Sequence, residues 1–213
     1  MKIAFDIDDT LASLVPLIIH YFNRRLNTSI KISEITHYEL EKVFGVEKAQ
    51  TDKVFETIFG ERGHDLPLIK GAQEAVEVCQ QRGDELYIIT SRFPFCHDMT
   101  YSWLEQYLPQ FEREKVFFTH SKEGTKHSKG KICDNVGIDA LIDDAAYNIA
   151  SAANGQRELF LLSYPWNTSS EGLKVLDAHK GKYKIVGRHD INHIHHMHSG
   201  FEEFIAWRES LDY

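Results

Sequence analysis

Two pairs of carboxylates in this sequence each follow a short apolar segment. Asp6 and Asp8 close the segment at residues 2–7, and Asp143 and Asp144 follow the one at residues 140–142. In an extended chain, residues i and i+2 point to the same side, so Asp6 and Asp8 should converge where parallel strands end. Several carboxylates there would repel one another without a cation. Because oxygen ligands in an incomplete cage suit Mg²⁺, we expect Mg²⁺ at this edge.

Two simpler interpretations compete with a metal site. Aspartates after strands are often turn or cap residues, but two such pairs make this explanation weaker. The segment could also be a calcium loop that begins at Asp6. Such a loop needs Asp or Asn at its fifth position and Gly at its sixth, where this chain has Thr10 and Leu11, so the pattern fails.

Hydroxyl groups follow a third apolar segment. Residues 86–89 precede Thr90, Ser91 and Arg92. A hydroxyl with the backbone N–H groups behind it can hold a phosphate. Thr-Ser after a strand is more often a helix cap, so this pattern alone is weak.

Two lysines, Lys129 and Lys131, open the same expected helix. Its apolar residues are Ile132, Cys133 and Val136. At about 100° per residue, Lys129 falls on their side of the helix and Lys131 falls almost opposite. A lysine at a helix start is usually solvated. On the buried face, however, its ammonium can reach the strand ends, where the helix N–H groups also favour an anion. We therefore expect Lys129 near Asp6 and Lys131 in solvent.

The elements that would position these residues alternate along most of the chain. We predict strands at 2–7, 85–90, 115–118, 139–142 and 158–162, and helices at 71–82, 98–108 and 129–136. This alternation indicates right-handed βαβ units and an α/β fold with a parallel sheet. Residues 13–70 instead have helical patterns, at 14–26 with Ser13 as N-cap, at 33–43 and at 47–59, then a loop at 60–68. The prediction is an α/β core at 1–12 and 71–213, with a helical insertion at 13–70.

Together these features resemble the haloacid-dehalogenase-like phosphatase superfamily, which has a Rossmann-like core. The six residues from Asp6, D-I-D-D-T-L, match its D-x-D-x-T-L motif. Thr90 matches the second motif, Lys129 the third and residues 142–144 the fourth. The insertion at 13–70 occupies the position of a C1-type cap.

Within that superfamily, the chain is similar to the 5′(3′)-deoxyribonucleotidase branch and its bacterial relatives. The short cap, the Thr90-Ser91 pair and the Tyr-Pro-Trp-Asn run at 164–167 support this resemblance. The chain differs from that branch at Leu14, where an aromatic residue is frequent. It also differs at Arg92, where proline is common.

The resemblance implies a role for each carboxylate. Asp6 would attack phosphorus to form an aspartyl-phosphate, and Asp8 would protonate the leaving alkoxide and then deprotonate the attacking water. Mg²⁺ would be bound by Asp6, the Asp8 backbone carbonyl and Asp143, with Asp144 close by. The residues expected to bind the phosphate oxygens are Thr90, Ser91 and Lys129.

The expected substrate is a small phosphate monoester, in first place a nucleoside monophosphate. A sugar phosphate or another metabolite is the alternative. A catalytically inactive phosphate-binding module is a third interpretation, which loss of Asp6 or Asp8 would have favoured. The candidate contacts for the organic part of the substrate are Arg92, Tyr21, Phe22, Tyr38 and Phe44, although most cap aromatics should pack the cap's own core.

Composition limits the remaining classes of function. The 213 residues include 24 Lys+Arg and 32 Asp+Glu, a formal net charge of −8, so a broad cationic surface for nucleic acid polymers is not expected. The three cysteines contain no C-x-x-C pair, which favours a reducing compartment. Early carboxylates argue against a signal peptide, and no stretch is apolar enough to span a membrane. We expect a cytoplasmic protein, and a homodimer is compatible with the sequence.

Histidines cluster near the end of the chain, at His189, His193, His195, His196 and His198. If this segment is helical, His189, His193 and His196 share a face and could bind a transition metal. A polar surface segment and a metal acquired during purification are the alternatives.

Overall fold

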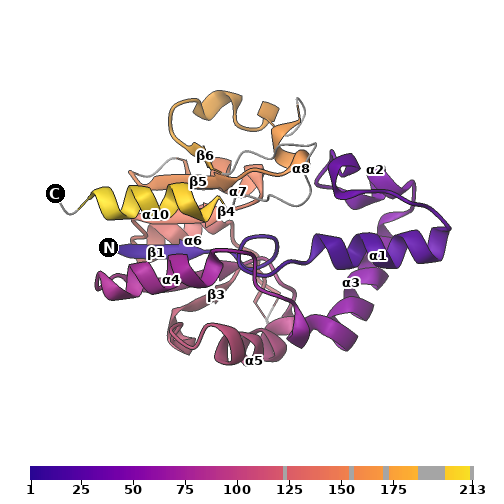
Figure 1. Ribbon diagram of the computed structural model, residues 1–213, viewed down its shortest axis with the longest axis horizontal. Coiled ribbons are helices and arrows are strands. Elements are labelled where there is room, and N and C mark those ends of the chain that lie inside the picture. Colours follow the sequence, from indigo (N-terminus) through magenta and orange to yellow (C-terminus); the bar gives the residue numbers. More distant parts are fainter. Residues whose placement is uncertain (122–123, 154–155, 170–172, 187–199, 212–213) are drawn as a thin grey trace.

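The computed structural model describes residues 1–121, 124–153, 156–169, 173–186 and 200–211. Within them, six strands form one parallel sheet in the order β3-β2-β1-β4-β5-β6 (Figure 1). Their bounds are β1 (Lys2–Phe5), β2 (Glu85–Thr90), β3 (Val116–Phe118), β4 (Ala140–Asp143), β5 (Glu158–Leu162) and β6 (Lys184–Val186). The first strand of the chain lies inside the sheet, between β2 and β4. The α/β prediction is confirmed.

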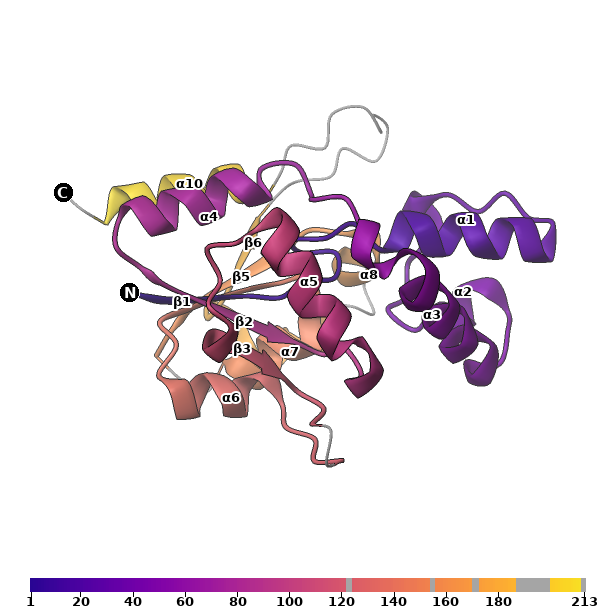
Figure 2. The same ribbon diagram turned by 90° about the horizontal axis from the view of Figure 1, so that it is seen from below.

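Helices cover both faces of the sheet, as Figure 2 shows. One face packs against α4 (Ala72–Gln81), α5 (His97–Tyr107) and α10 (Phe201–Ser210), and the other against α6 (Lys129–Val136) and α7 (Ala146–Ala152). Alternate residues of β1 serve the two faces. Ile3 and Phe5 pack on the first and Ala4 on the second. A strand buried on both faces is apolar throughout, which explains the unbroken apolar run before Asp6.

The helices of residues 13–70 lie beyond one end of the sheet (Figure 1). They are α1 (Val15–Leu26), α2 (Leu40–Phe44) and α3 (Lys48–Arg62), with short 3-10 helices at Ile32–Glu34 and Gly63–Asp65. The chain leaves the core and returns to it side by side. The Ser13 N–H donates to the Pro67 carbonyl at 2.9 Å, and the Ile69 N–H donates to the Leu11 carbonyl at 2.8 Å. We propose that residues 13–70 form a cap, with this double crossing as its connection to the core.

The start of α1 differs from the sequence prediction. Ser13 is not its cap. The helix begins after Leu14, and the Asp9 carboxylate accepts hydrogen bonds from the N–H groups of Leu14 (3.1 Å) and Val15 (3.0 Å). Asp9 has a φ of 55°, a left-handed conformation that Asp tolerates better than most residues. Burial raises the pKa of Asp9 to about 7, although the Val15 N–H opposes this. A residue of the first acidic segment therefore holds the first helix of residues 13–70.

Two other predictions need correction. The helix expected at 33–43 is wrong, because only the 3-10 helix at Ile32–Glu34 and α2 form there. The β-branched pair Ile35-Thr36 has low helix propensity and lies between them. The loop expected from residue 60 begins later, since α3 runs to Arg62. Beyond residue 162, where we predict no helix or strand from the sequence, the described part contains α8 (Pro165–Thr168), a 3-10 helix at Asp177–His179, β6 and α10.

Other sequence predictions concern cysteines, membranes and the histidine cluster. Cys79, Cys96 and Cys133 are all buried and free. Among the described residues, no helix is both long enough and apolar enough to cross a bilayer. The histidines at 189–198 lie outside the described residues.

Candidate active site

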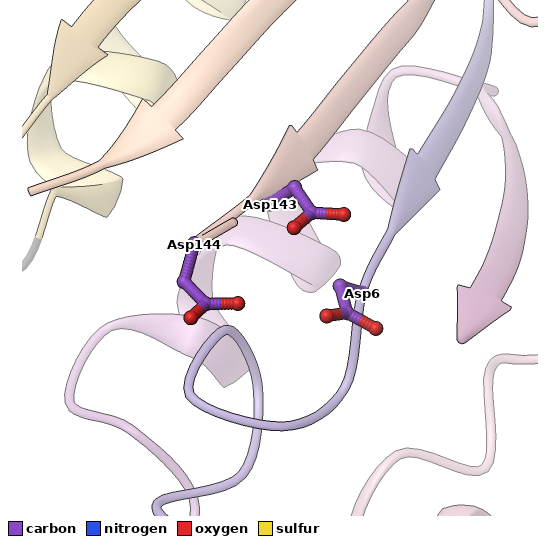
Figure 3. Close-up of side chains that lie close together, drawn as sticks. All are labelled: Asp6, Asp143 and Asp144. Atoms are coloured by element: carbon purple, nitrogen blue, oxygen red, sulfur yellow. The ribbon is translucent and has the colours of Figure 1, made fainter. Parts of the chain in front are cut away.

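Three buried aspartates meet at the carboxyl ends of β1 and β4. The two strands run side by side, and the Asp6 N–H donates to the Ile142 carbonyl at 3.0 Å. This pairing sets Asp6 beside Asp143, the last residue of β4, and Asp144 follows. Asp6, Asp143 and Asp144 each offer one carboxylate oxygen, and these three atoms lie within 4.8 Å of one another (Figure 3). The structure thus brings Asp6 of the first acidic pair together with both members of the second pair, Asp143 and Asp144.

Lys129 joins two of these carboxylates. Its ammonium lies 2.7 Å from Asp6 Oδ1 and 2.7 Å from Asp143 Oδ2, and its side chain is fully buried. Lys131, two positions along α6, is exposed. The helical wheel therefore predicted the faces of both lysines correctly. The Ser128 hydroxyl accepts from the Lys131 N–H at 3.2 Å and caps the helix that carries them.

Gly130 lets α6 approach α7 closely enough for this arrangement. A Cβ at this position would lie 2.0 Å from the Ser151 carbonyl oxygen of α7, so no larger residue fits without moving a helix. The Gly130 N–H also donates to the Ser151 hydroxyl at 3.1 Å. Helix α6 carries Lys129, and α7 carries Asn148, whose amide donates a hydrogen bond to Asp143. The close contact between the two helices therefore fixes the distance between Lys129 and Asn148.

Residues missed in the sequence hold the second acidic pair. Asp143 Oδ1 accepts from the Ala145 N–H at 2.8 Å and from the Asn148 amide at 3.1 Å. Asp144 Oδ2 accepts from the Trp166 indole at 3.0 Å, and its backbone carbonyl accepts from the Asn167 amide at 2.6 Å. The Tyr-Pro-Trp-Asn run at 164–167 supported the family resemblance, but its role as support for Asp144 could not be read from the sequence.

The electrostatics of the cluster favour a bound cation. Burial raises the pKa of Asp6 to about 7, with Lys129 opposing and Asp143 and Asp8 adding to the shift. Burial, then the charges of Asp143 and Asp6, raises the pKa of Asp144 well above its usual range. Three ionised carboxylates beside one ammonium would leave a buried charge of −2. A hard divalent cation with oxygen ligands would offset it, so the donor set fits such an ion.

Asp8 is held apart from the cluster by an arginine. Arg92 donates to Asp8 with two nitrogens, Nε to Oδ2 at 2.9 Å and Nη2 to Oδ1 at 2.7 Å. Its third nitrogen, Nη1, donates to the Thr100 hydroxyl at 3.1 Å, and its guanidinium lies 5.1 Å from the centre of the Phe59 ring of α3. Only 1% of the Arg92 side chain is exposed. Arg92 binds Asp8 and also lines the cavity described below, so its role as a substrate contact stays a prediction.

The hydroxyl pair after β2 lies beside these groups. Thr90 is fully buried at the end of the strand, and its hydroxyl accepts from the Arg92 N–H at 3.3 Å. Ser91 lines the same cavity as Asp6 and Asp8. The backbone turn after the strand therefore carries both a hydroxyl that faces the cavity and the arginine that binds Asp8.

A cavity of about 500 Å³ connects the acidic site to the helices of residues 13–70. Asp6, Asp8 and Asp144 line one part of it. The residues that line it from 13–70 include Leu14, Val15, Ile18, Ile35, Leu40, Thr51, Phe55 and Phe59. The volume lies within the range of about 300–1,000 Å³ that is usual for small-molecule sites.

The aromatic residues expected to contact substrate divide into two groups. Tyr38 lines the cavity, and its hydroxyl accepts a hydrogen bond from the hydroxyl of Tyr147 in the core at 3.2 Å. Phe22 and Phe44 are buried and stack on each other at 4.3 Å between ring centres. Tyr21 packs edge-on against Phe22. Tyr21, Phe22 and Phe44 are not among the residues that line the described cavity, so their packing gives no support to the prediction that they contact substrate.

Comparison with known proteins gives this geometry a family. Residues 1–189 match the family model described as 5′ nucleotidase, deoxy (Pyrimidine), cytosolic type C protein. The chain belongs to this family. It is a phosphoric monoester hydrolase of the haloacid-dehalogenase-like superfamily, in its nucleotidase branch. The resemblance drawn from the four motifs is confirmed at this level.

Individual relatives agree with this assignment. Two curated proteins, both named "Putative nucleotidase", are similar over most of their length. The one from Oceanobacillus iheyensis is 26% identical over 84% of this chain and 96% of its own. The one from Bacillus subtilis is 23% identical over 78% of this chain and 82% of its own length.

Solved structures share the fold. A haloacid-dehalogenase-like protein of unknown function from Agrobacterium tumefaciens aligns with a TM-score of 0.66 and 13% identity, over 98% of this chain and 97% of its own. A haloacid-dehalogenase family hydrolase from Deinococcus radiodurans, solved with bound phosphate and sodium, aligns with a TM-score of 0.59 and 16% identity. The alignment covers 83% of this chain and 87% of that protein.

Proposed function

We propose that this family member is a Mg²⁺-dependent nucleotidase that hydrolyses nucleoside monophosphates through an aspartyl-phosphate on Asp6. The observation that carries the proposal is the Lys129 bridge between Asp6 and Asp143, where 2.7 Å contacts hold a buried ammonium beside the expected nucleophile. The cavity above it is large enough for a small organic phosphate.

Each residue of the site has a task that its surroundings suit. Asp6 attacks phosphorus, and Lys129, Thr90 and Ser91 bind the phosphoryl oxygens as charge develops on them. Asp8 gives a proton to the leaving alkoxide and takes one from the water that cleaves the intermediate.

Asp6, the Asp8 backbone carbonyl, Asp143 and Asp144 would hold the Mg²⁺. When bound, the ion supplies shielding between the anionic phosphate and the anionic nucleophile. Lys129, Asn148 and the Ala145 N–H keep the Asp143 carboxylate oriented toward Asp6. The raised pKa values of Asp6 and Asp144 support the need for such an ion, because burial and their own mutual charges otherwise penalise ionisation.

The walls of the cavity favour a nucleotide over a sugar phosphate. Buried Leu14, Ile18, Leu40 and Phe59 face the space where the organic part of the substrate would lie. Apolar walls suit a planar base, whereas a sugar would present hydroxyl groups that such walls leave unpaired. A sugar phosphate stays as the second candidate, because Tyr38, His37 and Glu39 add polar groups.

Substrate profiling with the purified protein tests both halves of the proposal. We expect kcat/KM for nucleoside 5′- or 3′-monophosphates to exceed that for ribose 5-phosphate at least about tenfold. Chelation should remove activity, Mg²⁺ should restore it, and Ca²⁺ should support it poorly because its coordination is larger and looser. A preference for ribose 5-phosphate would refute the nucleotide assignment, and full turnover after exhaustive chelation would refute the metal assignment.

A further inference from the structure

Thr51 of α3 is buried on the wall of the active-site cavity with an unsatisfied hydroxyl. The residue is 3% exposed, and its Oγ1 has no hydrogen-bond partner among the described residues. The same cavity is lined by Asp6 and Asp8. A buried hydroxyl without a partner is unfavourable, so one that faces a ligand cavity indicates a partner that the ligand brings.

Other helical threonines of this protein show what Thr51 lacks. The Thr57 hydroxyl, in the same helix, donates to the Lys53 carbonyl at 2.9 Å. The Thr100 and Thr168 hydroxyls likewise donate to the carbonyls four residues earlier, at 2.7 Å each. This back-bond is the usual way for a helical threonine to satisfy its hydroxyl. Thr51 makes no such bond.

The other buried residues around this part of the cavity are apolar. Of the buried residues of 13–70 that line the cavity, Thr51 is the only polar one, and the others include Ile18, Ile35 and Leu40. Lys48 and Asp52, which lie on either side of it in the helix, pair with each other at 2.9 Å in more exposed positions. The Thr51 hydroxyl is therefore the one hydrogen-bonding side-chain group in the buried part of this wall, as far as the structure describes it, and the polar residues His37, Tyr38, Glu39, Lys48 and Asp52 line its more exposed parts.

We propose that the Thr51 hydroxyl hydrogen-bonds a polar edge atom of the nucleobase and so determines specificity for base-bearing substrates. This inference rests on the proposed nucleotidase function. A base is planar and apolar on its faces and polar at its edge, which matches a buried wall that is apolar apart from one hydroxyl. Because a hydroxyl both donates and accepts, Thr51 can satisfy either a carbonyl or an N–H group. It selects for the presence of a base more than for its identity.

The test compares Thr51→Val with Thr51→Ser and with a matched control, Thr57→Val. Thr51→Val keeps the shape of the side chain and removes only the hydroxyl, whereas Thr51→Ser keeps the hydroxyl. Steady-state kinetics are measured on nucleoside monophosphates and on acetyl phosphate, whose two-carbon organic part is too short to carry a base edge. The midpoint of thermal unfolding is measured for each variant.

Thr51→Val should lower kcat/KM for nucleoside monophosphates at least about tenfold more than for acetyl phosphate, with most of the change in KM. Thr51→Ser should restore most of the loss, and Thr57→Val should match the wild type on both substrates. The unfolding midpoint of Thr51→Val should not fall, since an unpaired buried hydroxyl is removed.

Two results would overturn the inference while leaving the proposed function intact. One is a Thr51→Val enzyme with wild-type kinetics on nucleotides. The other is an equal loss on nucleotides and acetyl phosphate, which would indicate a structural role. A wild-type enzyme that hydrolyses acetyl phosphate but no nucleoside monophosphate would instead refute the proposed function, and the assignment of Thr51 to a base with it.

Discussion

The buried polar groups on the two sides of the cavity, the core side and the side of residues 13–70, differ in whether they have partners. On the core side, the charged side chains have partners before any substrate arrives, since Lys129 contacts Asp6 and Asp143, and Arg92 binds Asp8. On the side of residues 13–70, the buried wall is apolar apart from Thr51, whose hydroxyl has no partner in the described part of the chain. The charged groups of the core side are organised in advance, whereas the one buried hydroxyl described on the other side is left for the ligand to bind.

This difference follows from what each side must do. Groups that stabilise developing charge act best when they need no rearrangement at the moment of reaction, which requires fixed partners in a buried place. A recognition surface gains selectivity in another way. A group left unpaired by the wrong ligand penalises that ligand, so an unsatisfied hydroxyl discriminates more strongly than an apolar wall alone. Substitutions on the core side should therefore lower turnover of every substrate.

Asp6→Asn gives the largest expected effect. An amide cannot attack phosphorus to form the acyl phosphate, so turnover of nucleotides and acetyl phosphate alike should fall by at least about 10⁴-fold. The fold should persist, because Lys129 keeps its contact with Asp143. Steady-state kinetics and circular dichroism measure the two quantities. If the folded variant retained most of its activity on either substrate, Asp6 would not be the nucleophile.

Lys129→Ala should come second and Lys131→Ala should be close to silent. Removing the buried ammonium takes away a preorganised charge beside Asp6 and should lower kcat/KM by roughly 10²–10³-fold. Lys131 is exposed, so its removal should change kcat/KM by no more than about twofold. Assays of both variants on acetyl phosphate separate this effect from base recognition. If Lys129→Ala and Lys131→Ala had equal kcat/KM, the buried Lys129 would contribute no more to catalysis than the exposed Lys131.

The core side of the site could be predicted from the sequence because it depends on local rules. The short apolar segment at residues 2–7 placed Asp6 near a strand end, and period-3.6 geometry placed Lys129 on the buried face of α6. The pairing of β1 with β4 then follows from the parallel α/β topology. The first two steps use neighbours that are close in the sequence, and short apolar strands carry a strong signal. The pairing of β1 with β4 is long-range, since it joins residues such as Ile3 and Ala140.

The support and recognition residues could not be predicted, because they come from distant segments. Arg92 reaches Asp8 across 84 positions, and Trp166 reaches Asp144 across 22. Neither contact leaves a periodic trace. Thr51 was invisible for another reason. It is an ordinary threonine in a helix, and only the packing of α3 over the cavity distinguishes it from Thr57. The stacking of Phe22 on Phe44, two of the candidate substrate contacts, could not be predicted for the same lack of long-range information.

Arg92→Met should produce the smallest of these effects, and one that depends on the leaving group. Arg92 holds both oxygens of Asp8 and also contacts the Phe59 ring, so it fixes the expected acid-base residue and links it to α3. Methionine can fill much of the same space but cannot hold a carboxylate. Since general acid catalysis contributes about 10²–10⁴-fold, loss of its positioning alone should lower kcat for nucleotides on the order of tenfold.

An aryl phosphate such as p-nitrophenyl phosphate needs no proton on its leaving group, so its kcat should fall less. Arg92→Lys should be intermediate, because an ammonium supplies charge but not the two parallel bonds. Equal losses of kcat on both substrates, together with a lower unfolding midpoint, would show that Arg92 has only a structural role. Asp8 would then have no positioning partner, and the contrast between the core side of the cavity and the side of residues 13–70 would fail at this residue.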